Sequence, residues 1–183
     1  VFGGVHCTFD FERIMKKGVD AVFLKEADQT FPAFIKYARG ESDFDTSIHG
    51  FTYKSGKGFK KIEYTDPPDF KNLPMPAWDL VDTGNYHKVT QVSGLKKVIN
   101  VKNYNGFKNE KAPTAIVQTV RGCLARCTFC SVRNFNGFGV RSRKTQDVVD
   151  ELEYLVKNFN IKYVEIVDDD FTTDHKRAVE ICK

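Results

Sequence analysis

The sequence contains no long apolar segment, little excess charge and few cysteines. No hydrophobic run approaches the roughly 18–20 residues that a membrane-spanning helix requires, so we expect no membrane span. The formal net charge of +4 over 183 residues is mild, and nucleic-acid-binding domains are usually more basic. We therefore interpret the lysine-rich segments as solvated loops. With 41% hydrophobic and 28% charged residues, the composition is typical of a globular protein.

The cysteines argue against a disulfide framework, because their number is odd and three of the five fall within eight positions. Cys123, Cys127 and Cys130 form a C-x3-C-x2-C pattern, which indicates metal binding in a reducing compartment. We therefore expect a cytoplasmic protein. Cys7 and Cys182 have no partners at a similar spacing, and we expect both to be ordinary buried thiols.

The sequence starts without a methionine and stops within a predicted helix, so we interpret it as a fragment. Its composition changes twice along the chain. We predict the C-terminal part of one domain in residues 1–45, a connector in residues 46–112, and the N-terminal part of a second domain in residues 113–183.

Residues 1–45 alternate between strand and helix patterns. A strand ends at Gly3 and Gly4, a short helix starts with Asp10 as its N-cap, and residues 19–24 form an apolar strand before a second helix. This order predicts an α/β domain with a parallel sheet and helices on its faces.

Residues 46–112 contain most of the turn residues. The turn at residues 55–58, between two short aromatic-rich runs, predicts a β-hairpin. The prolines that follow exclude a long helix or a central strand. We expect Trp78 and Leu80 to pack inward as anchors of this connector. Residues 96–111 are polar, and we expect them to be mobile.

Residues 113–183 predict two successive strand–loop–helix units. The cysteines follow the first strand, and the clearest helix covers residues 145–159, with Thr145 as its cap and one apolar stripe. The next strand, residues 163–167, runs directly into three aspartates. This order begins a βα barrel or a layered sheet, in which functional groups lie on the loops after the strands.

The spacing of Cys123, Cys127 and Cys130 allows one short loop to supply three thiolates to an iron–sulfur cluster. A cluster with four irons normally takes four cysteines. A set of three leaves one iron free to bind a small cosubstrate, which is the arrangement needed for one-electron cleavage of a carbon–sulfur bond. A zinc site completed by His175 or Cys182 is the alternative, although structural zinc usually uses two paired knuckles.

The segment 119–133 resembles the cluster loop of the radical S-adenosylmethionine (SAM) superfamily, including the aromatic Phe129 before the third cysteine. The resemblance implies a 4Fe-4S cluster on the three cysteines, SAM on its fourth iron, and Phe129 near the adenine. Asp168, Asp169 and Asp170 match the strand end that contacts the SAM amine in other branches. A turn-and-cap role is the alternative for each aspartate.

The branch with consecutive aspartates at that place often has an upstream cobalamin-binding domain, and residues 1–45 resemble the end of one. Gly3 and Gly4 are the implied contacts with cobalamin, because glycines let the backbone approach a ligand closely. Residues 25–28, Lys-Glu-Ala-Asp, depart from the Gly-Glu-x-Glu turn usual in the family. We interpret His6 as an unliganded turn histidine.

The resemblance thus implies an α/β fold class: the tail of a doubly wound cobalamin-binding domain, a connector, and the first βα units of a radical SAM partial (β/α) barrel. It implies a cobalamin-dependent radical SAM enzyme, in which reductive cleavage of SAM at a 4Fe-4S cluster starts radical chemistry, such as methyl transfer or cyclisation. A small molecule or lipid would be the substrate, and a flavodoxin or ferredoxin would donate electrons. The fragment alone is expected to be inactive.

Two alternatives stay open at this point. A tRNA methylthiotransferase also joins an upstream domain to a radical SAM core, and lysine clusters would suit it. Its upstream domain should contribute three further cysteines, whereas only Cys7 precedes Cys123 here. A zinc-binding interaction module is the non-enzymatic alternative.

Overall fold

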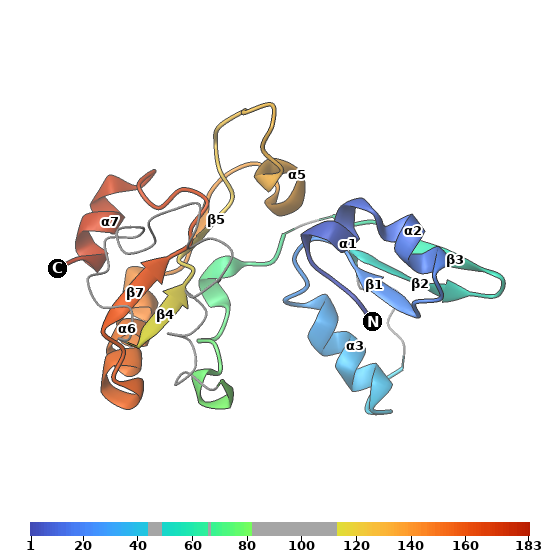
Figure 1. Ribbon diagram of the computed structural model, residues 1–183, viewed down its shortest axis with the longest axis horizontal. Helices are drawn as coiled ribbons and strands as arrows, with labels where there is room; N and C mark the ends of the chain where they lie inside the picture. Colours follow the sequence, from blue (N-terminus) through green and yellow to red (C-terminus); the bar gives the residue numbers. More distant parts are fainter. Residues whose placement is uncertain (44–48, 66, 82–112) are drawn as a thin grey trace, which may run out of the picture. The chain divides into compact units, whose positions relative to one another are not determined.

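The computed structural model describes residues 1–43, 49–65, 67–81 and 113–183 (Figure 1). The chain forms two compact units: the first combines Val1–Phe70 with Gly122–Val140, and the second combines Lys71–Arg121 with Arg141–Lys183. The segment 96–111, which we expect to be mobile, lies outside the described residues. The division of the sequence into two partial domains and a connector stays a prediction.

The first unit is built on a three-stranded sheet in the order β1-β2-β3. β1 covers Ala21–Phe23, β2 covers Phe51–Ser55 and β3 covers Gly58–Ile62, and both pairs are antiparallel. The predicted hairpin is therefore confirmed, and its strands extend the sheet that β1 begins. Among the described residues of this unit, the expected parallel pairing involving the N-terminal strand is limited to a bridge between Phe2 and Val22.

Helices cover both faces of this sheet, because successive side chains of β1 point to opposite faces. Val22 packs with Cys7 of α1 (Val5–Phe9) and Met15 of α2 (Phe11–Lys16). Phe23 points the other way and contacts Phe34 of α3 (Thr30–Ala38), with 5.4 Å between ring centroids. Figure 1 shows α1 and α2 on one side of the sheet and α3 on the other.

Three details of the sequence interpretation need correction. The residues after Gly4 form the helix α1 rather than an open turn. Asp10 occupies the N-cap of α2 but makes no capping hydrogen bond there, because its carboxylate pairs with Arg13 at 2.5 Å. Cys7 is buried as expected, whereas Cys182 is exposed at the end of α7 (His175–Ile181).

The second unit contains two parallel strands, β4 (Thr114–Val117) and β7 (Tyr163–Ile166), joined in sequence through α6 (Thr145–Phe159). Leu155 of α6 lies in one core with Val117 of β4 and Ile161. The predicted strand–helix–strand order is confirmed, and the helix has the bounds that its apolar stripe indicates.

Trp78 joins the same core from the 3-10 turn η2 (Trp78–Leu80), as expected. Leu80 is 82% exposed, so the prediction that it anchors the connector is wrong. Thr145 is the first helical residue of α6, and the N-cap position belongs to Lys144, which makes no side-chain capping bond. A cap is present on α7, where the Asp174 carboxylate accepts the backbone N–H of Arg177 at 3.0 Å.

The remaining elements are short. β5 (Val120–Arg121) pairs antiparallel with β6 (Arg141–Ser142), α5 (Val132–Asn136) lies between them in sequence, and η1 covers Phe70–Asn72. Within the described ranges, no helix combines the length and the apolar character that crossing a membrane would take.

Candidate functional site

The cysteines lie in the segment between β5 and β6, called here the cysteine loop (residues 122–140). Two glycines close its base, Gly122 with φ +86° and Gly139 with φ +107°. These backbone conformations favour glycine. A Cβ atom on Gly122 would lie 2.2 Å from the carbonyl oxygen of Gly139, and the neighbouring Cys123 forms a bridge with Phe138. The two sides of the loop therefore meet where a side chain would not fit.

All three cysteines of the loop are in the reduced state; Cys123 is half-buried, and Cys127 and Cys130 are exposed. The backbone N–H of Ala125 donates to the Cys123 sulfur at 3.3 Å. Among the described residues, no three cysteine, histidine or acidic side chains are grouped so that they could hold a metal ion. The donor chemistry fits an iron–sulfur cluster, but the sulfurs are spread along an open loop.

Phe129, the predicted adenine contact, is 91% exposed on the same loop. A second aromatic ring nearby in sequence, Phe138, has the guanidinium of Arg133 4.5 Å from its centroid, which is a cation–π distance. Because its side chain is so exposed, Phe129 offers a ring face on which a planar group can stack.

Asp168, the first of the three predicted aspartates, is bound to the polypeptide itself. Its carboxylate accepts the backbone N–H of Val120 at 2.8 Å, and it also bonds the backbone N–H and the hydroxyl of Thr119. Asp169 and Asp170 are half-buried beyond the end of β7. The structure thus joins Asp168 to the segment that leads into the cysteine loop.

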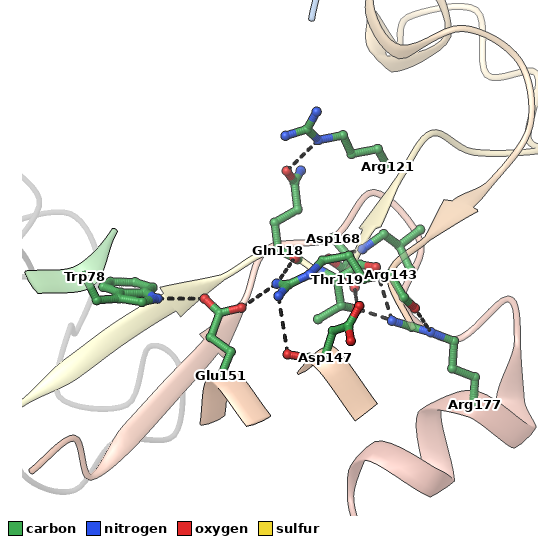
Figure 2. A network of polar contacts seen from close by, with 10 residues as sticks. Trp78, Gln118, Thr119, Arg121, Arg143, Asp147, Glu151, Asp168 and Arg177 are labelled. Atoms are coloured by element: carbon green, nitrogen blue, oxygen red, sulfur yellow. Dashed lines mark hydrogen bonds and ion pairs between the residues drawn. The ribbon is translucent and has the colours of Figure 1, made fainter. Parts of the chain in front are cut away.

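A buried ion pair lies beside this segment (Figure 2). The Arg143 guanidinium pairs with one carboxylate oxygen of Glu151, and these side chains are 6% and 1% exposed. The other oxygen accepts the indole N–H of Trp78 at 2.7 Å. Arg143 also donates to the backbone carbonyl of Gln118 at 3.2 Å. Every charge in this pair has a partner, which a buried ion pair requires for stability.

Arg177 of α7 is the second buried arginine. Its guanidinium donates to the carbonyl of Arg143 at 3.1 Å, the carbonyl of Thr119 at 3.1 Å and the Thr119 hydroxyl at 3.2 Å (Figure 2). Burial lowers the pKa of Arg177 from its ordinary value, while the nearby carboxylates of Asp168 and Asp174 oppose that shift. The guanidinium stays charged because the pKa of arginine is so high.

The predicted cobalamin contacts lie at the start of the first unit. Gly3 and Gly4 are exposed, Gly4 has φ +91°, and a Cβ atom on Gly4 would meet nothing within 4 Å. The bare turn fits the close approach of a large flat ligand. His6 is also exposed, with its imidazole 3.9 Å from the Asp10 carboxylate.

Thr8 connects this glycine turn to the turn after β1. Its hydroxyl donates to the carbonyl of Gly4 at 2.9 Å and accepts the backbone N–H of Lys25 at 2.7 Å. Lys25 has a left-handed backbone with φ 58°. One hydroxyl thus links the two turns.

The sequence interpretation assigned no role to Thr8, Arg143, Glu151 or Arg177. One signal was available for Glu151, because it is a charged residue on the apolar stripe of α6, three positions after Val148 and four before Leu155. A charge on a buried stripe indicates a buried partner.

No family model matches the chain. A cytidylyl-2-hydroxyethylphosphonate methyltransferase from Streptomyces wedmorensis is 27% identical over 98% of this chain and 35% of the relative's length. An anaerobic magnesium-protoporphyrin IX monomethyl ester cyclase from Rubrivivax gelatinosus is 25% identical over 100% of this chain and 30% of the relative. The chain therefore spans about a third of the length of the curated relatives it matches.

The fold is similar to that of a solved enzyme, the cobalamin-dependent S-adenosylmethionine radical enzyme OxsB with aqua-cobalamin bound. The TM-score is 0.67 with 22% sequence identity, over 98% of this chain and 23% of OxsB. The α/β fold class expected from the sequence is confirmed. The expected resemblance to cobalamin-dependent radical SAM enzymes is confirmed as well, at the level of the fold and of sequence relatives that are methyltransferases and cyclases.

Proposed function

We propose that this chain is part of a cobalamin-dependent radical SAM enzyme. The observation that carries the proposal is a loop with three cysteines at C-x3-C-x2-C spacing, on a chain whose fold is similar to part of OxsB. Because the chain spans about a third of its relatives, the activity belongs to a longer protein, and we expect the 183 residues alone to be inactive.

Cys123, Cys127 and Cys130 would hold a 4Fe-4S cluster, which supplies the electron for reductive cleavage of SAM when it is bound. The remaining roles fall to side chains of this chain. Phe129 offers an exposed ring for the adenine. Asp168, Asp169 and Asp170 are the candidates for the SAM amine, and Asp168 also accepts the backbone N–H groups of Thr119 and Val120.

Gly3 and Gly4 would lie against cobalamin, and the open space at Gly4 supports this role. Methyl transfer and ring closure are the two reaction classes of the relatives. We propose a cytoplasmic enzyme that acts on a small molecule or lipid and takes electrons from a flavodoxin or ferredoxin, because a one-electron cleavage needs a low-potential donor.

Anaerobic reconstitution of a longer protein that contains this chain, with iron and sulfide, tests the proposal. We expect about four irons per chain and a brown protein whose electron paramagnetic resonance spectrum changes when SAM is added. A colourless protein that binds zinc stoichiometrically, or a cluster with no response to SAM, would contradict it. The zinc result would instead support the alternative of a zinc-binding interaction module.

A further inference from the structure

The polar network of the second unit gathers around two short backbone segments. The first segment, residues 118–121, follows β4 and includes β5. The second segment, residues 141–143, consists of β6 and the residue after it. The segments pair with each other, Val120 opposite Ser142 and Arg121 opposite Arg141. The cysteine loop leaves the first segment and returns to the second along the chain.

Side chains satisfy the backbone of both segments. Asp168 accepts the N–H groups of Thr119 and Val120, while Arg177 donates to the carbonyls of Thr119 and Arg143. Arg143 adds a bond to the carbonyl of Gln118 at 3.2 Å. Unpaired backbone groups in a buried place are costly, and bonds with a charged partner are the stronger kind.

From this arrangement we infer that Asp168 and Arg177 are positioning residues for the cysteine loop. They hold its two ends in the metal-free chain, so that the backbone leading to Cys123 is fixed before a cluster is bound. Asp168 therefore acts through the backbone N–H groups of Thr119 and Val120. This inference rests on the proposed function for the role of the loop.

Two substitutions of Asp168 separate positioning from direct contact. Asp168→Asn keeps an oxygen that accepts the two N–H groups and gains an amide that donates to the Thr119 hydroxyl. Asp168→Ala removes all three bonds. If Asp168 positions the loop, the asparagine variant behaves like the wild type and the alanine variant does not. If Asp168 binds the SAM amine through its charge, both variants lose the response to SAM.

Amide hydrogen exchange on the full, metal-free chain is the first readout. We expect the N–H groups of Thr119 and Val120 to exchange at least about tenfold faster in Asp168→Ala, since each loses its acceptor, and clearly less fast in Asp168→Asn, which keeps a neutral acceptor. Arg177→Met should also speed the exchange of the Thr119 and Val120 N–H groups. Asp150→Ala, at an exposed position of α6, is the matched control and should change nothing.

Iron content and the SAM-induced spectral change of the reconstituted protein are the second readout. Asp168→Ala should retain less than about a fifth of the iron, whereas Asp168→Asn should keep both the iron and the response to SAM. Unchanged exchange in Asp168→Ala overturns the inference, as does an asparagine variant that keeps its cluster but loses the response to SAM.

Two further outcomes can be told apart from these: a variant that fails to fold, and a wild-type chain that assembles no cluster. Should Asp168→Ala fail to fold, Arg177→Met removes the bonds to the carbonyls of Thr119 and Arg143, and unchanged exchange at Thr119 and Val120 in that variant overturns the inference. Because exchange needs no metal, a wild-type chain that assembles no cluster contradicts the proposed function alone.

Discussion

The indole N–H of Trp78 donates a 2.7 Å hydrogen bond to the carboxylate of Glu151, a residue 73 positions away in sequence. Both residues are buried, and the same carboxylate neutralises Arg143. A turn in the predicted connector is thereby fixed to α6 by a polar contact inside an apolar core.

Glu151→Ala should destabilise the second unit strongly, because it leaves the Arg143 charge buried without its partner. Breaking a buried pair in this way costs about 3–5 kcal/mol. Trp78→Phe, which removes the N–H donor together with part of the buried ring, should cost at least about 1–3 kcal/mol. Urea unfolding followed by circular dichroism measures both. Leu80→Ala is the control, and its exposed side chain predicts a change within about 0.5 kcal/mol.

Gly122→Ala should disrupt the base of the cysteine loop. A Cβ there would meet the Gly139 carbonyl oxygen at 2.2 Å, in addition to the strain of φ +86°. Gly137→Ala is a matched control in the same loop, with φ +84° and nothing within 4 Å. The control should lose about 1–3 kcal/mol from backbone strain alone, because φ +84° with ψ 179° is a region that glycine adopts almost exclusively, and Gly122→Ala should lose clearly more. Equal losses in a denaturation series would show that the close approach is unimportant.

Cys127→Ala should abolish cluster assembly, since two thiolates do not hold a 4Fe-4S cluster. Cys182→Ala removes an exposed thiol outside the loop and should leave iron and sulfide content unchanged. Cys7→Ala should keep the cluster as well but lose some stability, because Cys7 is buried among apolar side chains. Iron content and absorption spectra after anaerobic reconstitution measure these effects. Comparable iron loss in all three variants would refute the ligand assignment.

Thr8→Val should loosen the glycine turn, because valine has the shape of threonine but lacks the hydroxyl between Gly4 and Lys25. The expected cost is about 1–3 kcal/mol, with weaker cobalamin binding in a longer protein that contains the whole domain. Thr8→Ser keeps the hydroxyl and serves as the control. Unfolding measurements and a cobalamin titration of both variants check the prediction. If serine and valine variants behave alike, the hydroxyl does not link the turns.

Hydrophobic periodicity and turn residues predict most of the helices and strands in the fold. The stripe on α6 predicts its bounds because a long amphipathic helix repeats one signal over several turns, and residues 55–58 predict the hairpin. The capping predictions failed at Thr145 and Asp10. A cap depends on whether a side chain is free to bond the backbone, and Asp10 pairs with Arg13 instead.

The site was predictable only in part. The spacing of the cysteines lies within one loop, so the sequence contains it directly. The contacts of Asp168 join residues 48 and 49 positions apart, and those of Arg177 reach 58 positions to Thr119. Long-range pairs of this kind depend on how strands and helices pack, which a single sequence does not specify.

The hairpin has one more consequence, for the behaviour of the protein at high concentration. Within the described part of the sheet, β3 pairs only with β2, so its other edge has no strand partner among the described residues. An uncovered edge can recruit strands from other molecules. Lys60 and Lys61 on β3 are exposed, and since Lys61 pairs with Glu63 at 2.9 Å, Lys60 is the residue that places a positive charge on that strand. Like charges on two such edges repel, which protects the chain against edge-to-edge aggregation.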